Sequence, residues 1–133
     1  MWGEWRVTLT LFVPARGKFG RVMKCRRKES GEIFAAKFVS CARREDRRNV
    51  EREVEIMNGL KSALILQLYE AWDSGRGEMC LITEYIGGGE LFDRVIEEEF
   101  VLSERACCVF TKQILEGVSY IHRQGVIHLD LKV

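Results

Sequence analysis

The stretch EIFAAKFVS, residues 32–40, places one lysine inside the apolar run FAAKF. The pattern is that of a β-strand, and its alternation puts Ala35 and Lys37 on the same face. A lysine on the apolar face of a strand needs a physical reason. One alternative is an edge strand from which the side chain reaches water. The other is an internal lysine paired with an anion.

The next segment, residues 44–60, supplies a candidate anion. Its periodicity predicts a helix, and one face carries Val50, Val54 and Met57. Glu53 borders this apolar face, whereas the other acidic residues can pair weakly with the helix arginines on a solvated face. A buried cation and a buried anion are each costly alone and tolerable together. We therefore expect Lys37 to pair with Glu53.

The remaining elements predict an α+β fold. Further strand patterns occupy residues 7–13, 21–25, 65–72 and 79–86. A short helix is expected in the second part of residues 87–99. A long helix is expected over residues 104–124, with Ser103 as its N-cap and Gly125 as its stop. Gly59 is the expected stop of the helix in residues 44–60. Because the strands adjoin as hairpins with one helix inserted, and the other helices follow them, the chain is expected to have segregated strand and helix parts.

Composition excludes several classes of function. The 133 residues carry a net charge of +1, so nothing indicates binding to nucleic acid or to a membrane surface. The apolar run near the start is too short to span a bilayer. Five cysteines without C-x-x-C spacing indicate reduced thiols in a cytoplasmic protein, in preference to disulfides or a zinc site.

Two short motifs could handle phosphate. In RGKFGRV, residues 16–22, backbone amides could approach a phosphate and Phe19 could fold over it, although a plain hairpin turn is the default. In VIHLDLK, residues 126–132, VIH is expected to be a short buried strand or turn. Asp130 could accept a proton from a hydroxyl, and Lys132 could neutralise a phosphoryl group. His128 is more often a satisfied core histidine.

In this order and spacing, the motifs resemble the protein kinase family. The resemblance extends from about Arg16 to Lys132 and includes a hinge in LITEYIGGGELFDRV, residues 81–95. EIMNGL, LQLYEAWDS, EYIGGGELFDRV and Leu129 in place of the usual Arg are similar to the calcium/calmodulin-dependent group, particularly myosin light chain kinase and titin-like (stretchin-type) muscle kinases.

The resemblance implies a partial kinase domain over residues 16–133, preceded by an atypical segment, residues 1–15, that could hold the first strand. The small lobe would occupy about residues 16–83, the hinge about 84–90 and the start of the large lobe about 91–133. Pro14 and Ala15 stand where the family usually has an aliphatic residue and a glycine. Both the first strand and the grip on phosphate are therefore altered there.

The resemblance also implies an ATP site. A loop would cover the phosphates, and it comprises Ala15, Arg16, Gly17, Lys18, Phe19 and Gly20. Val22 and Ala35 would sandwich the adenine, while Lys37 would hold the α- and β-phosphates and pair with Glu53. The hinge side would be formed by Thr83 as gatekeeper, the Glu84 carbonyl and Ile86 amide at the adenine edge, and Glu90 at the ribose or a basic substrate residue.

For catalysis, the resemblance implies that Asp130 is the base and Lys132 steadies the γ-phosphate. A lysine two residues after the aspartate is the serine/threonine pattern. Val133 stands where Pro is expected, and the family's Mg²⁺ ligands would come later, so no metal ligand is assigned in this chain. We expect a truncated domain that is inactive alone.

The expected partner is a protein substrate, such as myosin light chain or another muscle protein, and calmodulin follows by family analogy alone. The alternative function is a catalytically silent kinase-like scaffold or regulatory module.

Overall fold

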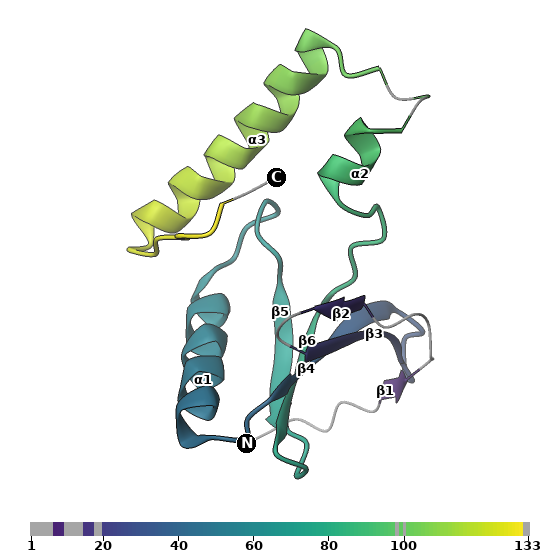
Figure 1. The fold of residues 1–133 in the computed structure, drawn as a ribbon. Helices are drawn as coiled ribbons and strands as arrows, with labels where there is room; N and C mark the ends of the chain where they lie inside the picture. The colour runs from purple at the N-terminus through teal and green to yellow at the C-terminus, as the bar shows by residue number, and fades with distance from the viewer. Residues whose placement is uncertain (1–6, 10–14, 18–19, 98, 100, 132–133) are drawn as a thin grey trace. The chain divides into compact units, whose positions relative to one another are not determined.

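The computed structural model describes residues 7–9, 15–17, 20–97, 99 and 101–131, and side chains from residue 20 onward. The chain divides into two compact units (Figure 1). The first comprises residues 1–61 and 66–85, and the second comprises residues 62–65 and 86–133. The first unit contains the sheet and helix α1, and the second contains helices α2 and α3.

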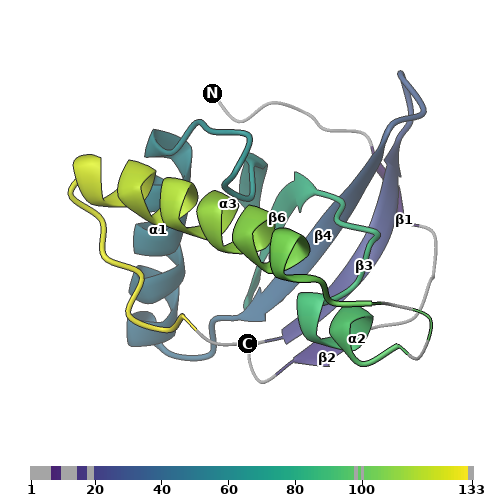
Figure 2. The ribbon, with the colours of Figure 1, turned by 90° about the horizontal axis from the view of Figure 1, so that it is seen from above.

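The sheet of the first unit is antiparallel throughout, with the order β1-β3-β4-β6-β5 and β2 paired with β3. Its strands are β1 (Val7–Leu9), β2 (Ala15–Gly17), β3 (Gly20–Arg27), β4 (Ile33–Ser40), β5 (Leu68–Asp73) and β6 (Glu78–Glu84). Figure 2 shows the β3–β4 hairpin along its length. The antiparallel sheet followed by helices confirms the α+β expectation.

Helix α1 (Arg44–Gly59) covers one face of this sheet. The core on that face consists of Val50, Leu68, Ala71, Met79 and Leu81. The core on the opposite face consists of Cys25, Phe34, Ala36, Phe38, Cys80 and Ile82. Because alternate residues of β4 point to opposite faces, Ala35 and Lys37 lie on the helix-covered face, as their spacing predicts.

Two buried thiols, in the core on the sheet face opposite to α1, behave as small apolar side chains. Cys25 and Cys80 are each 1% exposed, and all five cysteines are free. Burial raises the pKa of Cys80 to about 12 and also raises that of Cys25. Both thiols are therefore protonated and poorly nucleophilic at neutral pH.

Strands β1 and β2 share the free edge of β3, since β4 pairs along the other edge. Five residues separate Leu9 from Ala15, whereas two separate their partners Cys25 and Val22. The sequence from Leu9 to Ala15 is therefore three residues longer than the stretch of β3 between their partners. The expected strand over residues 7–13 is present at residues 7–9, and its remainder lies outside the described residues.

At its N-terminus, helix α1 has a side chain that accepts a backbone hydrogen bond, but at its C-terminus the cap is not a glycine. The Asp46 carboxylate accepts a hydrogen bond from the Arg43 amide at 3.0 Å. The helix ends at Gly59, as expected, but the stop comes from the extended Leu60, whose amide donates to the Met57 carbonyl. The glycine is helical at this position, so its left-handed freedom is not used.

In the second unit, α2 (Leu91–Val95) is short and α3 (Glu104–Arg123) is long. Ser103 Oγ accepts a hydrogen bond from the Ala106 amide at 3.2 Å, which confirms the predicted N-cap. Gly125 follows the helix with φ +74°, as its prediction as a stop requires. In the part of the chain that the structure describes, no helix combines the length and apolarity needed to cross a membrane.

The segment after α3 differs from its prediction. Ile127 is 68% exposed and His128 is also exposed, so VIH is neither a strand nor buried and His128 is not a core histidine. Val126 alone remains half-buried, and its amide donates to the Ile121 carbonyl at the helix end. The described residues of this unit include no strand. The apolar side chains of the segment therefore have no neighbouring strand to pack against.

Candidate functional site

The centre of the candidate site is the ion pair between Lys37 Nζ and Glu53 Oε1, which are 2.8 Å apart. This contact confirms the pairing inferred from the sequence. The side chains are 33% and 44% exposed, so the pair keeps part of its hydration and is less buried than the apolar pattern suggested. An ammonium group has three N–H donors, and one of them is engaged by Glu53.

The position of Lys37 excludes the edge-strand alternative, because β4 pairs with β3 on one side and β6 on the other. The register places Val22 directly opposite Lys37 and Thr83 directly opposite Ala35. Opposed residues of an antiparallel pair project from the same face. Val22, Ala35, Lys37 and Thr83, which come from three strands, therefore share the helix-covered face of the sheet.

Gly20, the first residue of β3, brings the β2–β3 hairpin into close contact with the backbone of β4. Its φ is +142°, and a Cβ at this position would lie 2.0 Å from the Phe38 carbonyl oxygen. Gly17 pairs opposite Gly20 as part of β2, together with Ala15 and Arg16. Lys18 and Phe19, which the sequence places over the phosphates, lie outside the described residues.

Thr83 and Glu84 form the end of β6, where the sequence predicts the start of a hinge. The Thr83 side chain is buried, and its hydroxyl donates to the Glu84 carbonyl at 3.1 Å. Glu84 Oε1 accepts from the Gln67 amide at 2.8 Å, and the Glu84 amide donates to the Gln67 carbonyl at 3.0 Å. Sequence reasoning missed Gln67, whose contacts hold this end of the strand in place.

The other predicted site residues belong to the second unit. Ile86 is 61% exposed, and Glu90 is exposed immediately before α2. The Asp130 amide donates to His128 Nδ1 at 3.3 Å. Between them Leu129 has φ +61°, a left-handed conformation that is rare for a branched side chain. Lys132 lies outside the described residues.

Metal ligands were not expected in this chain. Among the residues that the structure describes, no three His, Cys, Asp or Glu side chains are grouped so that they could hold a metal ion.

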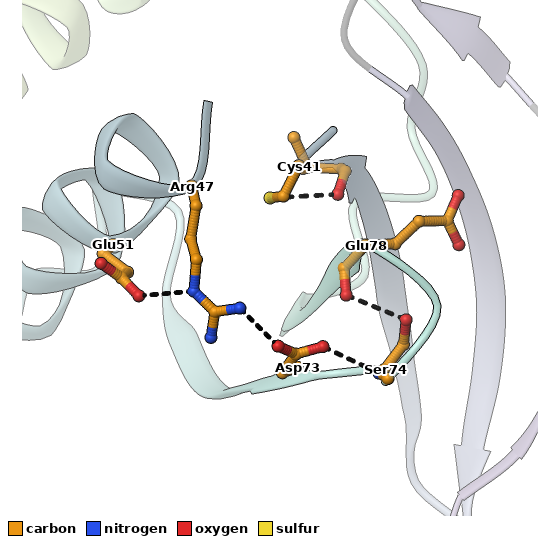
Figure 3. Close-up of polar contacts among 8 residues, drawn as sticks. Cys41, Arg47, Glu51, Asp73, Ser74 and Glu78 are labelled. Atoms are coloured by element: carbon orange, nitrogen blue, oxygen red, sulfur yellow. Dashed lines mark hydrogen bonds and ion pairs between the residues drawn. The ribbon is translucent and has the colours of Figure 1, made fainter. Parts of the chain in front are cut away.

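Sequence reasoning also missed an ion pair between α1 and the end of β5 (Figure 3). Arg47 Nη1 lies 2.6 Å from Asp73 Oδ2, while Arg47 Nε contacts Glu51 Oε1 at 3.0 Å. The hydrogen bond from the Gly75 amide, followed by that from Arg47, lowers the pKa of the Asp73 carboxyl. The helix pattern predicted weak pairs within α1, such as the one with Glu51, but gave no signal for the partner 26 residues away.

Comparisons with known proteins agree on one family. The protein kinase domain family matches residues 15–133. Over 116 residues, or 87% of this chain, the sequence is 46% identical to myosin light chain kinase 3 of Danio rerio and 40% identical to smooth muscle myosin light chain kinase of Gallus gallus. The chain spans 16% of the first relative and 6% of the second.

A solved structure of similar fold is a twitchin kinase fragment from C. elegans, described as an autoregulated protein kinase with immunoglobulin domains. Its TM-score is 0.86 and its sequence is 31% identical, with 95% of this chain and 28% of that chain covered.

Proposed function

The chain belongs to the protein kinase domain family and is related to myosin light chain kinase and twitchin kinase, and from this premise we propose that it contributes the ATP-binding part of a serine/threonine protein kinase. The observation that carries the proposal is the 2.8 Å contact between Lys37 and Glu53 on the sheet face that also holds Val22, Ala35 and Thr83. ATP would supply the phosphoryl group that is transferred to a protein hydroxyl.

The residues of the first unit fit a nucleotide. Lys37 presents ammonium donors beyond the one engaged by Glu53, and they can bind the α- and β-phosphate oxygens. Val22 and Ala35 give an apolar surface for adenine, and Gly20 keeps the hairpin backbone close to β4, from which Lys37 projects. The family resemblance assigns the Glu84 carbonyl and the Ile86 amide to the adenine edge and Glu90 to the ribose or a basic substrate residue, and Ile86 and Glu90 belong to the second unit.

The roles in phosphate transfer are assigned by motif. Asp130 would orient the substrate hydroxyl and accept its proton, and Lys132 would neutralise charge on the transferring group. The spacing of these two residues favours serine and threonine over tyrosine. The family holds magnesium with an Asn of the catalytic loop and the Asp of D-F-G, and these 133 residues include neither motif. We therefore expect negligible transfer from this chain alone.

The substrate class follows the relatives. A protein serine or threonine on myosin light chain or another muscle protein is the proposed target, and calmodulin is a proposed regulator by family analogy. Five free cysteines support a cytoplasmic location.

Calorimetric titration of the 133-residue chain with ATP and magnesium tests the proposal. The chain should bind ATP, and Lys37→Met should weaken binding about tenfold or more, because a charge-assisted hydrogen bond to phosphate is lost. Lys28→Met, which removes an exposed lysine of the β3–β4 turn, serves as the matched control and should leave the affinity unchanged.

Absence of ATP binding by the folded chain would refute the nucleotide assignment and favour the scaffold alternative. Transfer of phosphate to a light-chain serine peptide should stay below detection. Measurable transfer would contradict the expected inactivity of the chain by itself.

A further inference from the structure

The end of β5 and the turn after it, residues 73–77 (the 73–77 turn), contact the chain on both sides of the short connection between β4 and α1. The Cys41 amide, immediately after β4, donates to the Gly77 carbonyl at 2.8 Å. Arg47, in the first turns of α1, bonds to Asp73 at 2.6 Å (Figure 3). One turn therefore holds both the end of the strand that carries Lys37 and the start of the helix that carries Glu53.

The 73–77 turn is itself well ordered by internal hydrogen bonds. Asp73 Oδ1 accepts from the Gly75 amide at 2.8 Å, which leaves Oδ2 directed at Arg47. The amide and the hydroxyl of Ser74 both donate to the Glu78 carbonyl at 2.9 Å. The Asp73 carboxylate is thus a fixed acceptor and not a freely rotating surface charge.

Arg47 and Glu53 flank the buried face of α1. Each is three residues from Val50, which is 5% exposed, so their side chains project about 60° to either side of it. Apolar packing through Val50 is non-directional and tolerates rotation of the helix. The two ion pairs end on different strands, at Asp73 of β5 and Lys37 of β4, so rotation in either direction lengthens one of them.

We propose that Arg47 and Asp73 are positioning residues whose ion pair fixes the rotation of α1 that brings Glu53 to Lys37. The link to ATP rests on the proposed function, whereas the effect on the Lys37–Glu53 contact does not. The paired glutamate masks the lysine amine, so reactivity of Lys37 toward a small acylating reagent reports the contact without any nucleotide.

The test measures acetylation rates of individual lysines in the full chain by peptide mass spectrometry, with Lys28 as internal reference. Glu53→Gln defines the rate of unpaired Lys37. Asp73→Asn keeps a carbonyl oxygen for the Gly75 amide but removes the charge, and it should raise the Lys37 rate about two- to fivefold toward that limit. Arg47→Gln should have the same effect, and combining the two should add little.

Glu51→Gln is the matched control. It removes the negative charge from the 3.0 Å partner of Arg47 within α1 and leaves the ion pair with Asp73, so the Lys37 rate should not change. An unchanged Lys37 rate in both Asp73→Asn and Arg47→Gln would overturn the proposal, even if their melting temperatures fell. An equal response to Glu51→Gln would also overturn it.

Titration with ATP and magnesium separates this inference from the proposed function. If both hold, the Asp73→Asn chain binds ATP about two- to fivefold more weakly than the unaltered chain. If the Lys37 rate responds as expected while no form of the chain binds ATP, the positioning role is supported and the nucleotide assignment fails.

Discussion

Gly20 is the glycine, among those that the structure describes, whose replacement should be tolerated least. Its φ is +142°, and a Cβ added there would lie only 2.0 Å from the Phe38 carbonyl oxygen, which leaves no room for a side chain. Gly20→Ala should lower the free energy of unfolding by about 3 kcal/mol, because backbone strain and a steric clash add together. Denaturant unfolding followed by circular dichroism measures this loss.

Gly75 provides the control for backbone strain without crowding. It has φ +73° and nothing within 4 Å of a Cβ, so Gly75→Ala should cost about 1 kcal/mol. Equal losses at the two glycines would show that contact between the hairpin and β4 has no special importance.

Glu70 is a half-buried carboxylate on β5 whose Oε2 has no hydrogen-bond partner among the described residues. Burial raises the pKa of this carboxyl, and Arg27 partly opposes the shift. A raised pKa in the folded state means that ionisation destabilises the fold. The penalty is absent below the unfolded-state pKa and is complete once the pH exceeds the folded-state pKa.

Glu70→Gln should therefore stabilise the chain by about 1 kcal/mol at neutral pH, with the gain shrinking as the pH falls toward about 4. Urea unfolding at several pH values measures this difference. The exposed Glu55→Gln on α1 should show no comparable effect. A gain at Glu70 that grew at acid pH would contradict the assignment.

At the scale of elements, local signals predicted most of the helices and strands. Strand patterns bounded by turns located β3, β4 and β6, and the Ser103 and Gly125 signals located both ends of α3. The prediction that residues 126–128 (VIH) are buried was wrong, because composition identifies an apolar segment but does not show whether another element covers it. The end of α1 was predicted at the correct residue but for the wrong reason, because the extended Leu60, and not a left-handed Gly59, terminates the helix.

Helix α3 offers a direct test of a sequence signal. Ser103→Ala removes the acceptor for the Ala106 amide and should destabilise the helix start by about 1 kcal/mol. Hydrogen exchange of the amides in the first turn should accelerate accordingly. Ser119→Ala, inside the same helix, should leave exchange unchanged or slower because alanine favours helix.

At the scale of the whole molecule, the sequence predicted the Lys37–Glu53 pair because each residue alone violates the apolar pattern around it. It did not predict the Arg47–Asp73 pair, because both residues are ordinary on a solvated surface and their proximity depends on how α1 lies against β5. Contacts that depend on tertiary placement, such as Gln67 with Glu84, leave no periodic signal along the chain.

We propose that Lys37, held by Glu53, binds nucleotide phosphate. The most direct measurement is the ratio of the affinity for ATP to that for adenosine, compared between the 133-residue chain and its Lys37→Met variant. The unaltered chain should prefer ATP, and the variant should lose about tenfold of that preference while its adenosine affinity stays the same. An ATP preference unchanged by Lys37→Met would contradict the assignment of Lys37 to the nucleotide phosphates.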